Sequence, residues 1–132
     1  MTSIQWQKLE ALVLFAGSLV AYNMNGQAWW MYIALLLVPD VFMLGYAIDR
    51  RVGAFSYNFG HSLIGPVVLT LLGIREQNST VTSLGIIWFG HVGFDRMQGY
   101  GLKEETSFKN THLGRIGKEK PKHRERRKVS KD

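Results

Sequence analysis

Four ionisable side chains interrupt segments of this chain that are otherwise apolar: Asp40, His61, His91 and Asp95. Two imidazoles and two carboxylates are a suitable ligand set for a divalent metal ion such as zinc or iron. With water in an open position, such a metal would generate hydroxide near neutral pH and polarise an ester or phosphoester, while one carboxylate could instead act as general base. These four residues are therefore the candidate catalytic and metal-binding set.

The positions of these residues within their segments indicate that they meet. Asp40, His61 and His91 each lie about eight residues from one end of an apolar segment, which is about 12 Å at 1.5 Å per helical residue. Asp95 follows His91 by four residues and so shares its face of a helix. We therefore expect three helices to offer ligands in a single layer.

Further polar residues lie near this layer. Asn58 precedes His61 by three residues and is a candidate for binding substrate. His112, closer to the C-terminus, is a fifth candidate metal ligand. The basic side chains expected to hold an anionic headgroup are Arg96, Lys103 and Lys109.

The elements that must position these residues are four apolar segments, over residues 4–24 (beginning at Ile4 or Leu9), 28–48, 54–73 and 79–98. Each approaches the roughly 20 residues that a helix needs to cross a hydrocarbon core. Because the links between them are short, neighbouring helices should run antiparallel. The prediction is an all-α fold in which residues 1–98 form a four-helix antiparallel transmembrane bundle. A soluble bundle is disfavoured, since residues 54–73 contain no Asp, Glu, Lys or Arg for an outer face.

The placement of Arg and Lys predicts an orientation. The link after the second segment contains Arg50 and Arg51, whereas the first link contains no basic residue and the third contains Arg75 beside Glu76. Cytoplasmic loops of membrane proteins carry the excess of Lys and Arg. We therefore expect a multi-pass protein of the cytoplasmic (inner) membrane with both termini in the cytoplasm.

Charge is concentrated at the C-terminal end of the chain. Up to Phe94 four basic residues balance four acidic ones, so the whole net charge of +6 lies in residues 95–132. Such a segment beside a membrane attracts anionic headgroups by roughly 1 kcal/mol per Lys or Arg, so membrane lipid rather than nucleic acid is the expected partner. Residues 99–117 are expected to form a cytoplasmic cap, and residues 118–132 a disordered basic tail. The absence of cysteine excludes thiolate ligands and nucleophiles.

Two prolines stand inside the apolar segments. Pro39 and Pro66 leave carbonyl groups near Leu35 and Ser62 without partners in their own helices. Membrane helices tolerate such breaks where a cavity or a neighbouring helix supplies new partners. A polar cavity in the cytoplasmic half of the bundle would account for both.

Several short stretches carry a family resemblance. They lie at residues 38–40 (VPD), 43–46 (MLGY), 52–54 (VGA), 57–61 (YNFGH), 88–96 (WFGHVGFDR), 99–103 (GYGLK) and 108–114 (FKNTHLG). Over roughly Leu9 to Gly117 the chain resembles a bacterial family of small four-helix membrane proteins, domain of unknown function 4260. The resemblance implies a fold and no activity. More loosely, helices that bear His and Asp near one membrane face are similar to small membrane-bound metal-dependent hydrolases of bacteria.

The function most favoured by these residues is a metal-dependent membrane hydrolase that acts on a lipid or amphiphilic ester or phosphoester at the cytoplasmic leaflet. Three alternatives stay open. One is a proton or ion pathway through the buried His and Asp residues, and another is a haem-binding bundle with His61 and His91 as axial ligands. The third is a non-catalytic membrane interaction protein, in which groups such as His91 and Asp95 only specify helix pairing. The metal, the substrate and the oligomeric state, a homo-oligomer included, are also left open.

Overall fold

The structure is a computed structural model that describes residues 1–100, 103–104, 107–111 and 114–115. Helices make up almost all of it, as the sequence predicts. In chain order they are α1 (Ser3–Asn25), α2 (Trp29–Leu35), the 3-10 helix η1 (Val38–Ala47), α3 (Arg50–His61), α4 (Ile64–Arg75) and α5 (Ser79–Met97).

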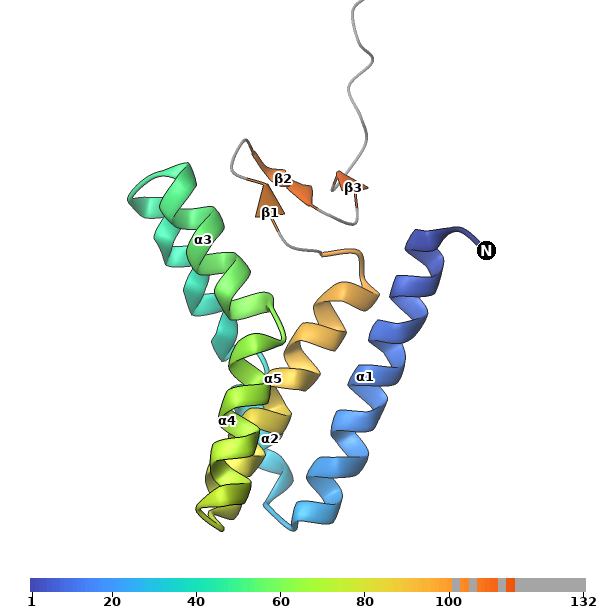
Figure 1. The fold of residues 1–132 in the computed structure, drawn as a ribbon, viewed down its shortest axis with the longest axis vertical. Coiled ribbons are helices and arrows are strands. Elements are labelled where there is room, and N and C mark those ends of the chain that lie inside the picture. Colours follow the sequence, from blue (N-terminus) through green and yellow to red (C-terminus); the bar gives the residue numbers. More distant parts are fainter. Residues whose placement is uncertain (101–102, 105–106, 112–113, 116–132) are drawn as a thin grey trace, which may run out of the picture.

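These helices form four rods that run up and down in turn (Figure 1). The first rod is α1, the second joins α2 to η1, the third joins α3 to α4, and the fourth is α5. α5 packs against both α1 and α4, and α3 packs against η1. The four rods correspond closely to the four apolar segments predicted from the sequence.

The rods begin and end at residues with suitable capping chemistry. Thr2 forms a capping box with Gln5 at the start of α1, where the Gln5 amide donates to the Thr2 hydroxyl and the Thr2 amide donates to the Gln5 side chain. α1 stops at Gly26, which adopts the left-handed conformation with φ 76°. Asp49 and Asn78 cap α3 and α5 by accepting hydrogen bonds from amides in their first turns. These caps therefore fix where the helices begin and end.

Glycine lets α5 approach α1 closely. A Cβ atom added at Gly93 would lie 2.8 Å from the Phe15 amide nitrogen and 2.9 Å from the Ala11 carbonyl oxygen. Small residues at such contacts are typical of packing between membrane helices, where close van der Waals contact replaces the hydrophobic effect.

The 3-10 helix η1 is ten residues long, whereas 3-10 runs beyond three or four residues are uncommon. Three residues per turn divide its side chains into three rows, because residues i and i+3 eclipse one another. The rows are Asp40–Met43–Tyr46, Pro39–Phe42–Gly45 and Val38–Val41–Leu44–Ala47. In the second row Phe42 meets Gly60 of α3 and Gly45 meets Ser56, while Tyr46 of the first row meets Gly53. The third row is exposed.

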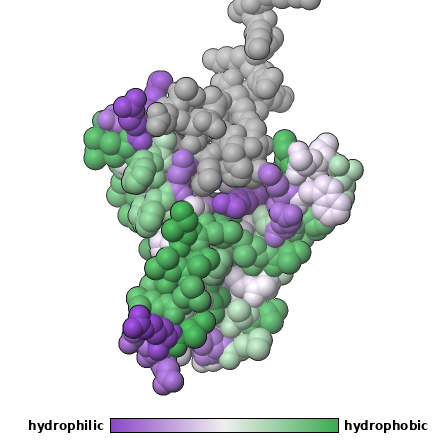
Figure 2. All heavy atoms as spheres, in the orientation of Figure 1, coloured by the Kyte–Doolittle hydropathy of each residue, from purple (hydrophilic) through white to green (hydrophobic). Residues whose placement is uncertain are grey.

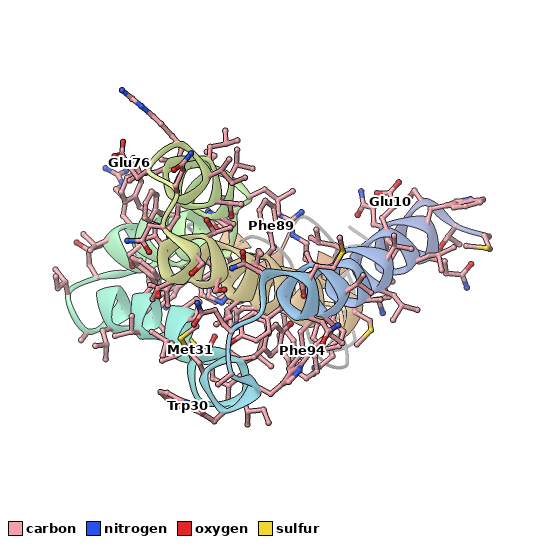
Figure 3. All side chains as sticks on the ribbon, turned by 90° about the horizontal axis from the view of Figure 1, so that it is seen from below. Glu10, Trp30, Met31, Glu76, Phe89 and Phe94 are labelled. Atoms are coloured by element: carbon pink, nitrogen blue, oxygen red, sulfur yellow. The ribbon has the colours of Figure 1, made fainter. Side chains whose placement is uncertain are left out.

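Much of the apolar surface faces outward. Along α4, Ile64, Val68 and Leu71 are each more than 60% exposed. Figure 2 shows this apolar surface between hydrophilic groups at the two ends of the molecule. Figure 3, viewed along the bundle, places Trp30 at the outer edge of α2 and shows Glu10 projecting from α1. Large contiguous apolar patches are rare on soluble monomers.

By length and composition, one helical segment of the described chain can cross a membrane, namely Trp29–Ala47. A second appears if Arg50–His61 and Ile64–Arg75, which meet at a bend of 42°, count as one span. α1 and α5 do not meet this criterion. The predicted helices are thus present, while four membrane crossings are not confirmed.

Three short strands follow the helices: β1 (Lys103–Glu104), β2 (Ser107–Thr111) and β3 (Gly114–Arg115). They form an antiparallel sheet in the order β1-β2-β3, in which Lys103 pairs with Thr111 and Asn110 with Arg115. The sheet lies at the end of the bundle where α1 begins and α5 ends (Figure 1), and β1 and β2 contact α3. The sequence pattern predicts an ordered cap in this segment but no strands. The predicted tail, residues 118–132, lies outside the described residues.

Candidate metal centre

Asp40, His61, His91 and Asp95 come together at the centre of the bundle. Asp40 belongs to η1, His61 is the last residue of α3, and His91 and Asp95 lie one turn apart on α5. One ligand atom from each residue lies within 4.8 Å of all the others. The structure therefore gathers the four residues selected from the sequence into one cluster, called the tetrad below.

The two histidines face each other at the middle of the tetrad. Their Nε2 atoms are 2.9 Å apart. The Nε2 atom of His61 lies 3.2 Å from Asp40 Oδ1 and 3.1 Å from Asp95 Oδ2, and the Nε2 atom of His91 lies 3.3 Å and 3.4 Å from the same two oxygens. Both carboxylates thus contact both imidazoles.

Backbone carbonyl groups orient both rings from the opposite side. The Nδ1 atom of His61 lies 2.9 Å from the Tyr57 carbonyl oxygen, and that of His91 lies 2.7 Å from the Leu36 carbonyl oxygen. A carbonyl only accepts, so Nδ1 carries the proton in each ring and a neutral ring presents a bare lone pair at Nε2. In the state with both rings neutral, two lone pairs and two carboxylate oxygens face one another within the tetrad.

The Leu36 carbonyl is available to His91 because of Pro39. In a continuous α-helix this carbonyl would accept from the Asp40 amide, four residues later. η1 begins at Val38 instead, and the Asp40 amide donates to Leu37 with a length of 3.1 Å. The break predicted from Pro39 therefore frees an acceptor that holds a ligand of the tetrad.

The break between α3 and α4 is stabilised by two side chains from α5. Trp88 Nε1 donates to the Gly60 carbonyl at 2.6 Å, and Arg96 Nη2 donates to the His61 carbonyl at 3.3 Å. α3 ends at His61 and α4 begins at Ile64, with Pro66 in its first turn. Donors on α5 thus bond two carbonyl groups at the end of α3, those of Gly60 and His61 rather than the predicted Ser62, and they hold the end of α3 that carries His61.

The tetrad is buried on one side and open on the other. His91 is 0% exposed and His61 2%, whereas the side chains of Asp95 and Asp40 are 15% and 41% exposed. The Tyr57 ring stacks on the His61 ring, with centroids 3.8 Å apart. A pocket of about 190 Å³ reaches the two carboxylates and is lined by Asp40, Met43, Tyr57, Asp95 and Tyr100. A small molecule that enters this pocket therefore meets the acidic members of the tetrad.

The tetrad fits a divalent metal ion. A tetrahedral ion with bonds of about 2.0–2.1 Å holds its ligand atoms about 3.3–3.4 Å apart. Five of the six pairs in the tetrad are separated by 2.9–3.4 Å. Metal-binding histidines almost always donate their second N–H to a carbonyl or carboxylate, as both do here. The donor set, two imidazoles and two carboxylates, suits zinc or iron.

A family model described as domain of unknown function (DUF4260) matches residues 4–116. The chain belongs to this family. No curated protein and no solved structure matches it significantly. The tetrad of this DUF4260 domain therefore has to be interpreted from its own geometry.

Other residues of the DUF4260 domain that the sequence singled out are not among the four residues of the tetrad. Asn58 is half-buried on α3 and does not line the pocket. Arg96, expected to hold a headgroup, donates to the His61 carbonyl. Lys103 and Lys109 belong to β1 and β2, at the tetrad end of the bundle. His112, the fifth candidate ligand, lies outside the described residues.

Two pocket residues were not anticipated. Met43 lines the pocket because it follows Asp40 by three residues, which is one full turn of a 3-10 helix, so the two side chains eclipse each other. In an α-helix, residues three apart do not eclipse one another. Tyr100 reaches it because the chain turns after α5, where the Tyr100 amide donates to the Asp95 carbonyl at 2.9 Å. In the sequence, Pro39 indicated the change of helix that places Met43. Gly99, which adopts φ 97°, indicated the turn that places Tyr100.

Proposed function

We propose that this chain is a membrane protein that binds one divalent metal ion, zinc or iron, at Asp40, His61, His91 and Asp95. It uses the metal to hydrolyse an ester or phosphoester of a membrane amphiphile. The observation that carries the proposal is the convergence of one ligand atom from each of the four residues, with both Nδ1 atoms placed against backbone carbonyls. With both Nδ1 protons given to backbone carbonyls, the two Nε2 atoms and two carboxylate oxygens meet as acceptors only.

Electrostatics favour a cation among these atoms. Two carboxylates and two lone pairs 2.9–3.4 Å apart repel one another, and the cost is high where the histidines are 0% and 2% exposed. A divalent ion bound by all four atoms neutralises both carboxylates and satisfies both lone pairs. The same ion needs no rearrangement of the rings, because the carbonyl groups of Tyr57 and Leu36 already fix them.

The pocket supports hydrolysis more than a purely structural metal. A metal with an open coordination position makes hydroxide available near neutral pH and polarises an ester or phosphoryl oxygen. Asp40 is the most exposed member of the tetrad and lines the pocket. In the hydrolytic state it would give up its place on the metal to a water molecule and accept that water's proton, while His61, His91 and Asp95 would hold the ion. Tyr57 and Tyr100 line the same pocket and bound the space for a substrate's polar group.

Membrane placement is supported by the outward-facing apolar surface and by the distribution of charge. We assign the end that carries the tetrad, Arg50, Arg51 and the sheet to the cytoplasmic face of the inner membrane, since positive charge collects there. All four rods then cross the bilayer, and both termini are cytoplasmic. In this topology Lys103 and Lys109, on β1 and β2, lie where anionic lipid headgroups gather.

A metal-free proton pathway is a second candidate, favoured by one observation. The 2.9 Å contact between the two Nε2 atoms, flanked by Asp40 and Asp95, is also the geometry of imidazoles that share a proton. Haem ligation is less favoured, because axial ligands bind opposite faces of the macrocycle and cannot lie within hydrogen-bond distance of each other. A purely structural polar cluster gives no reason for a pocket at the carboxylates.

Metal content decides between these functions. The detergent-purified protein, expressed with zinc or iron supplementation, should contain about one equivalent of metal, and His61→Ala and His91→Ala should contain almost none. Tyr32→Phe is the matched control, because it removes a buried hydrogen bond to Ser18 elsewhere in the bundle. A wild-type protein without metal would overturn the metal centre and leave the proton pathway.

Hydrolysis requires a separate assay. Loaded protein in mixed micelles should cleave fluorogenic amphiphilic esters or phosphoesters, and a chelator should abolish the cleavage. Stoichiometric metal without cleavage of either class would retain the metal centre and reject the hydrolase.

A further inference from the structure

An apolar groove runs beside η1, on the far side of the tetrad from the sheet. It has a volume of about 360 Å³. η1 contributes Val38 and Val41, α4 contributes Leu69, and α5 contributes Leu84, Ile87 and Trp88. The only polar atom of these six side chains, Trp88 Nε1, is already bonded to the Gly60 carbonyl. The groove therefore offers contact to hydrocarbon and no hydrogen bond from these side chains.

The groove adjoins the tetrad along two elements. On α5, Ile87 and Trp88 precede His91 by four and three residues, which is one helical turn or about 5 Å. On η1, Asp40 stands between Pro39 and Val41, and both of these residues line the groove. A molecule whose apolar part lies in the groove thus has its polar end within reach of the metal centre.

The order of the two sites along the bundle matches the order of groups in a lipid leaflet. α5 runs toward the sheet end, so Leu84 and Trp88 lie deeper than His91 and Asp95 in the proposed topology. A lipid of the cytoplasmic leaflet places its headgroup near that face and its chains toward the bilayer centre. Val38 and Val41, at the rim, are 53% and 52% exposed, so the groove is open to the surrounding hydrocarbon.

We infer that this groove binds one hydrocarbon chain of the amphiphile whose polar group reaches the tetrad. The inference rests on the proposed function and deepens it. It describes the substrate as an amphiphile with one hydrocarbon chain held parallel to α5 and an ester or phosphoester linkage at the cytoplasmic end of that chain.

Tryptophan fluorescence tests the groove directly. A protein with Trp6→Phe, Trp29→Phe and Trp30→Phe retains Trp88 as its only tryptophan, and the three removed residues are exposed. A single-chain amphiphile brominated on its tail is titrated into this protein in unbrominated micelles. Saturable quenching of Trp88 is expected. Filling the groove by Leu84→Phe, or from α4 by Leu69→Phe, should weaken the apparent affinity about tenfold.

A second apolar groove supplies the control. It lies between α1 and the α4–α5 pair, has a volume of about 550 Å³, and is lined in part by Leu14, Ile86 and Phe89. Leu14→Phe should leave the quenching of Trp88 unchanged. The chain-binding groove would be overturned if quenching rose linearly without saturation, or if neither Leu84→Phe nor Leu69→Phe altered it. It would also be overturned if a second copy of the protein occupied the groove, seen as a dimer that the amphiphile does not dissociate.

Metal content, measured on the same samples, separates this inference from the proposed function. Saturable quenching in metal-free protein would retain the groove and reject the metal centre. Stoichiometric metal with linear quenching would retain the metal centre and reject the groove.

Discussion

His61 and His91 approach each other through their Nε2 atoms at 2.9 Å, and each ring is held from behind by a carbonyl on its Nδ1 atom. When both rings are neutral, neither Nε2 atom can donate to the other, so this arrangement favours a cation between them, either a metal ion or a proton. A site of this kind is sensitive to metal supply, to the carbonyls behind the rings and to the packing that keeps three helices in register.

Metal removal should destabilise the protein. Binding of a ligand to the folded state alone adds about 2.7 kcal/mol when the ligand is present at 100 times its dissociation constant. A chelator should therefore lower the melting temperature in detergent, and returning zinc or iron should restore it. His61→Ala should melt at one temperature with or without metal. A wild-type melting temperature indifferent to both treatments would argue against the metal centre.

Pro39→Ala should weaken metal binding although it removes no ligand. Without the proline, α2 can continue and the Leu36 carbonyl can pair with the Asp40 amide, in competition with His91 Nδ1. Loss of such supporting contacts typically costs about 10- to 100-fold in metal affinity. Competition with a metallochromic chelator measures the change, and Val38→Ala, in the same turn, is the control that should retain wild-type affinity.

Trp88→Phe should destabilise the junction of α3 and α4. The substitution leaves the Gly60 carbonyl without the indole donor at 2.6 Å, and an unsatisfied buried acceptor costs about 1–3 kcal/mol. Thermal unfolding in detergent should shift downward accordingly. Equal melting temperatures for Trp88→Phe and the wild type would mean that the junction does not depend on this bond.

Gly93→Ala and Gly17→Ala should have opposite effects. The new Cβ at position 93 meets the backbone of Phe15 and Ala11, so α1 and α5 must separate, at a cost of about 1–3 kcal/mol. At position 17 nothing lies within 4 Å, and alanine in a helix is favoured by roughly 0.5–1 kcal/mol. Paired unfolding curves measure both, and destabilisation by Gly17→Ala would contradict the packing of α1 described above.

Single cysteines can test the four crossings, since the chain has no native cysteine. Glu76→Cys, on the link between α4 and α5, should react in intact spheroplasts with a membrane-impermeant maleimide. Arg51→Cys, in the first turn of α3, should react only after the membrane is opened. Labelling of both from outside would reject the proposed topology.

That the four tetrad residues come together could be predicted from their distances to the ends of the apolar segments, although two parts of that estimate were wrong. The prediction treated the second segment as α-helix throughout and began the third at Ala54. Asp40 in fact lies eight residues before Ile48 in a 3-10 helix of about 2.0 Å per residue, about 16 Å from that end. α3 begins earlier, at Arg50, which places His61 eleven residues in, also about 16 Å. The two deviations compensate, and the ligands still share a layer.

Features that depend on tertiary contacts were out of reach. The proline at 39 predicts a break in the helix, but whether the chain resumes as α or 3-10 depends on how Phe42 and Gly45 pack on α3. The strands at residues 103–115 are too short for a period-two pattern to stand out. The apolar composition predicts rods but not which rod is central, which the glycines of α5 decide by contact with α1 and α4.

The side chains of η1 repeat their direction every three residues, because a 3-10 helix has three residues per turn. Each residue advances by about 120°, so the rows that begin at Asp40, Pro39 and Val38 keep separate registers along the ten residues. Loss of Val41 or Phe42 would move Met43 and every following side chain of η1 into the neighbouring row and set Met43 against α3. Loss of three would shorten the helix by one turn and leave all three registers intact.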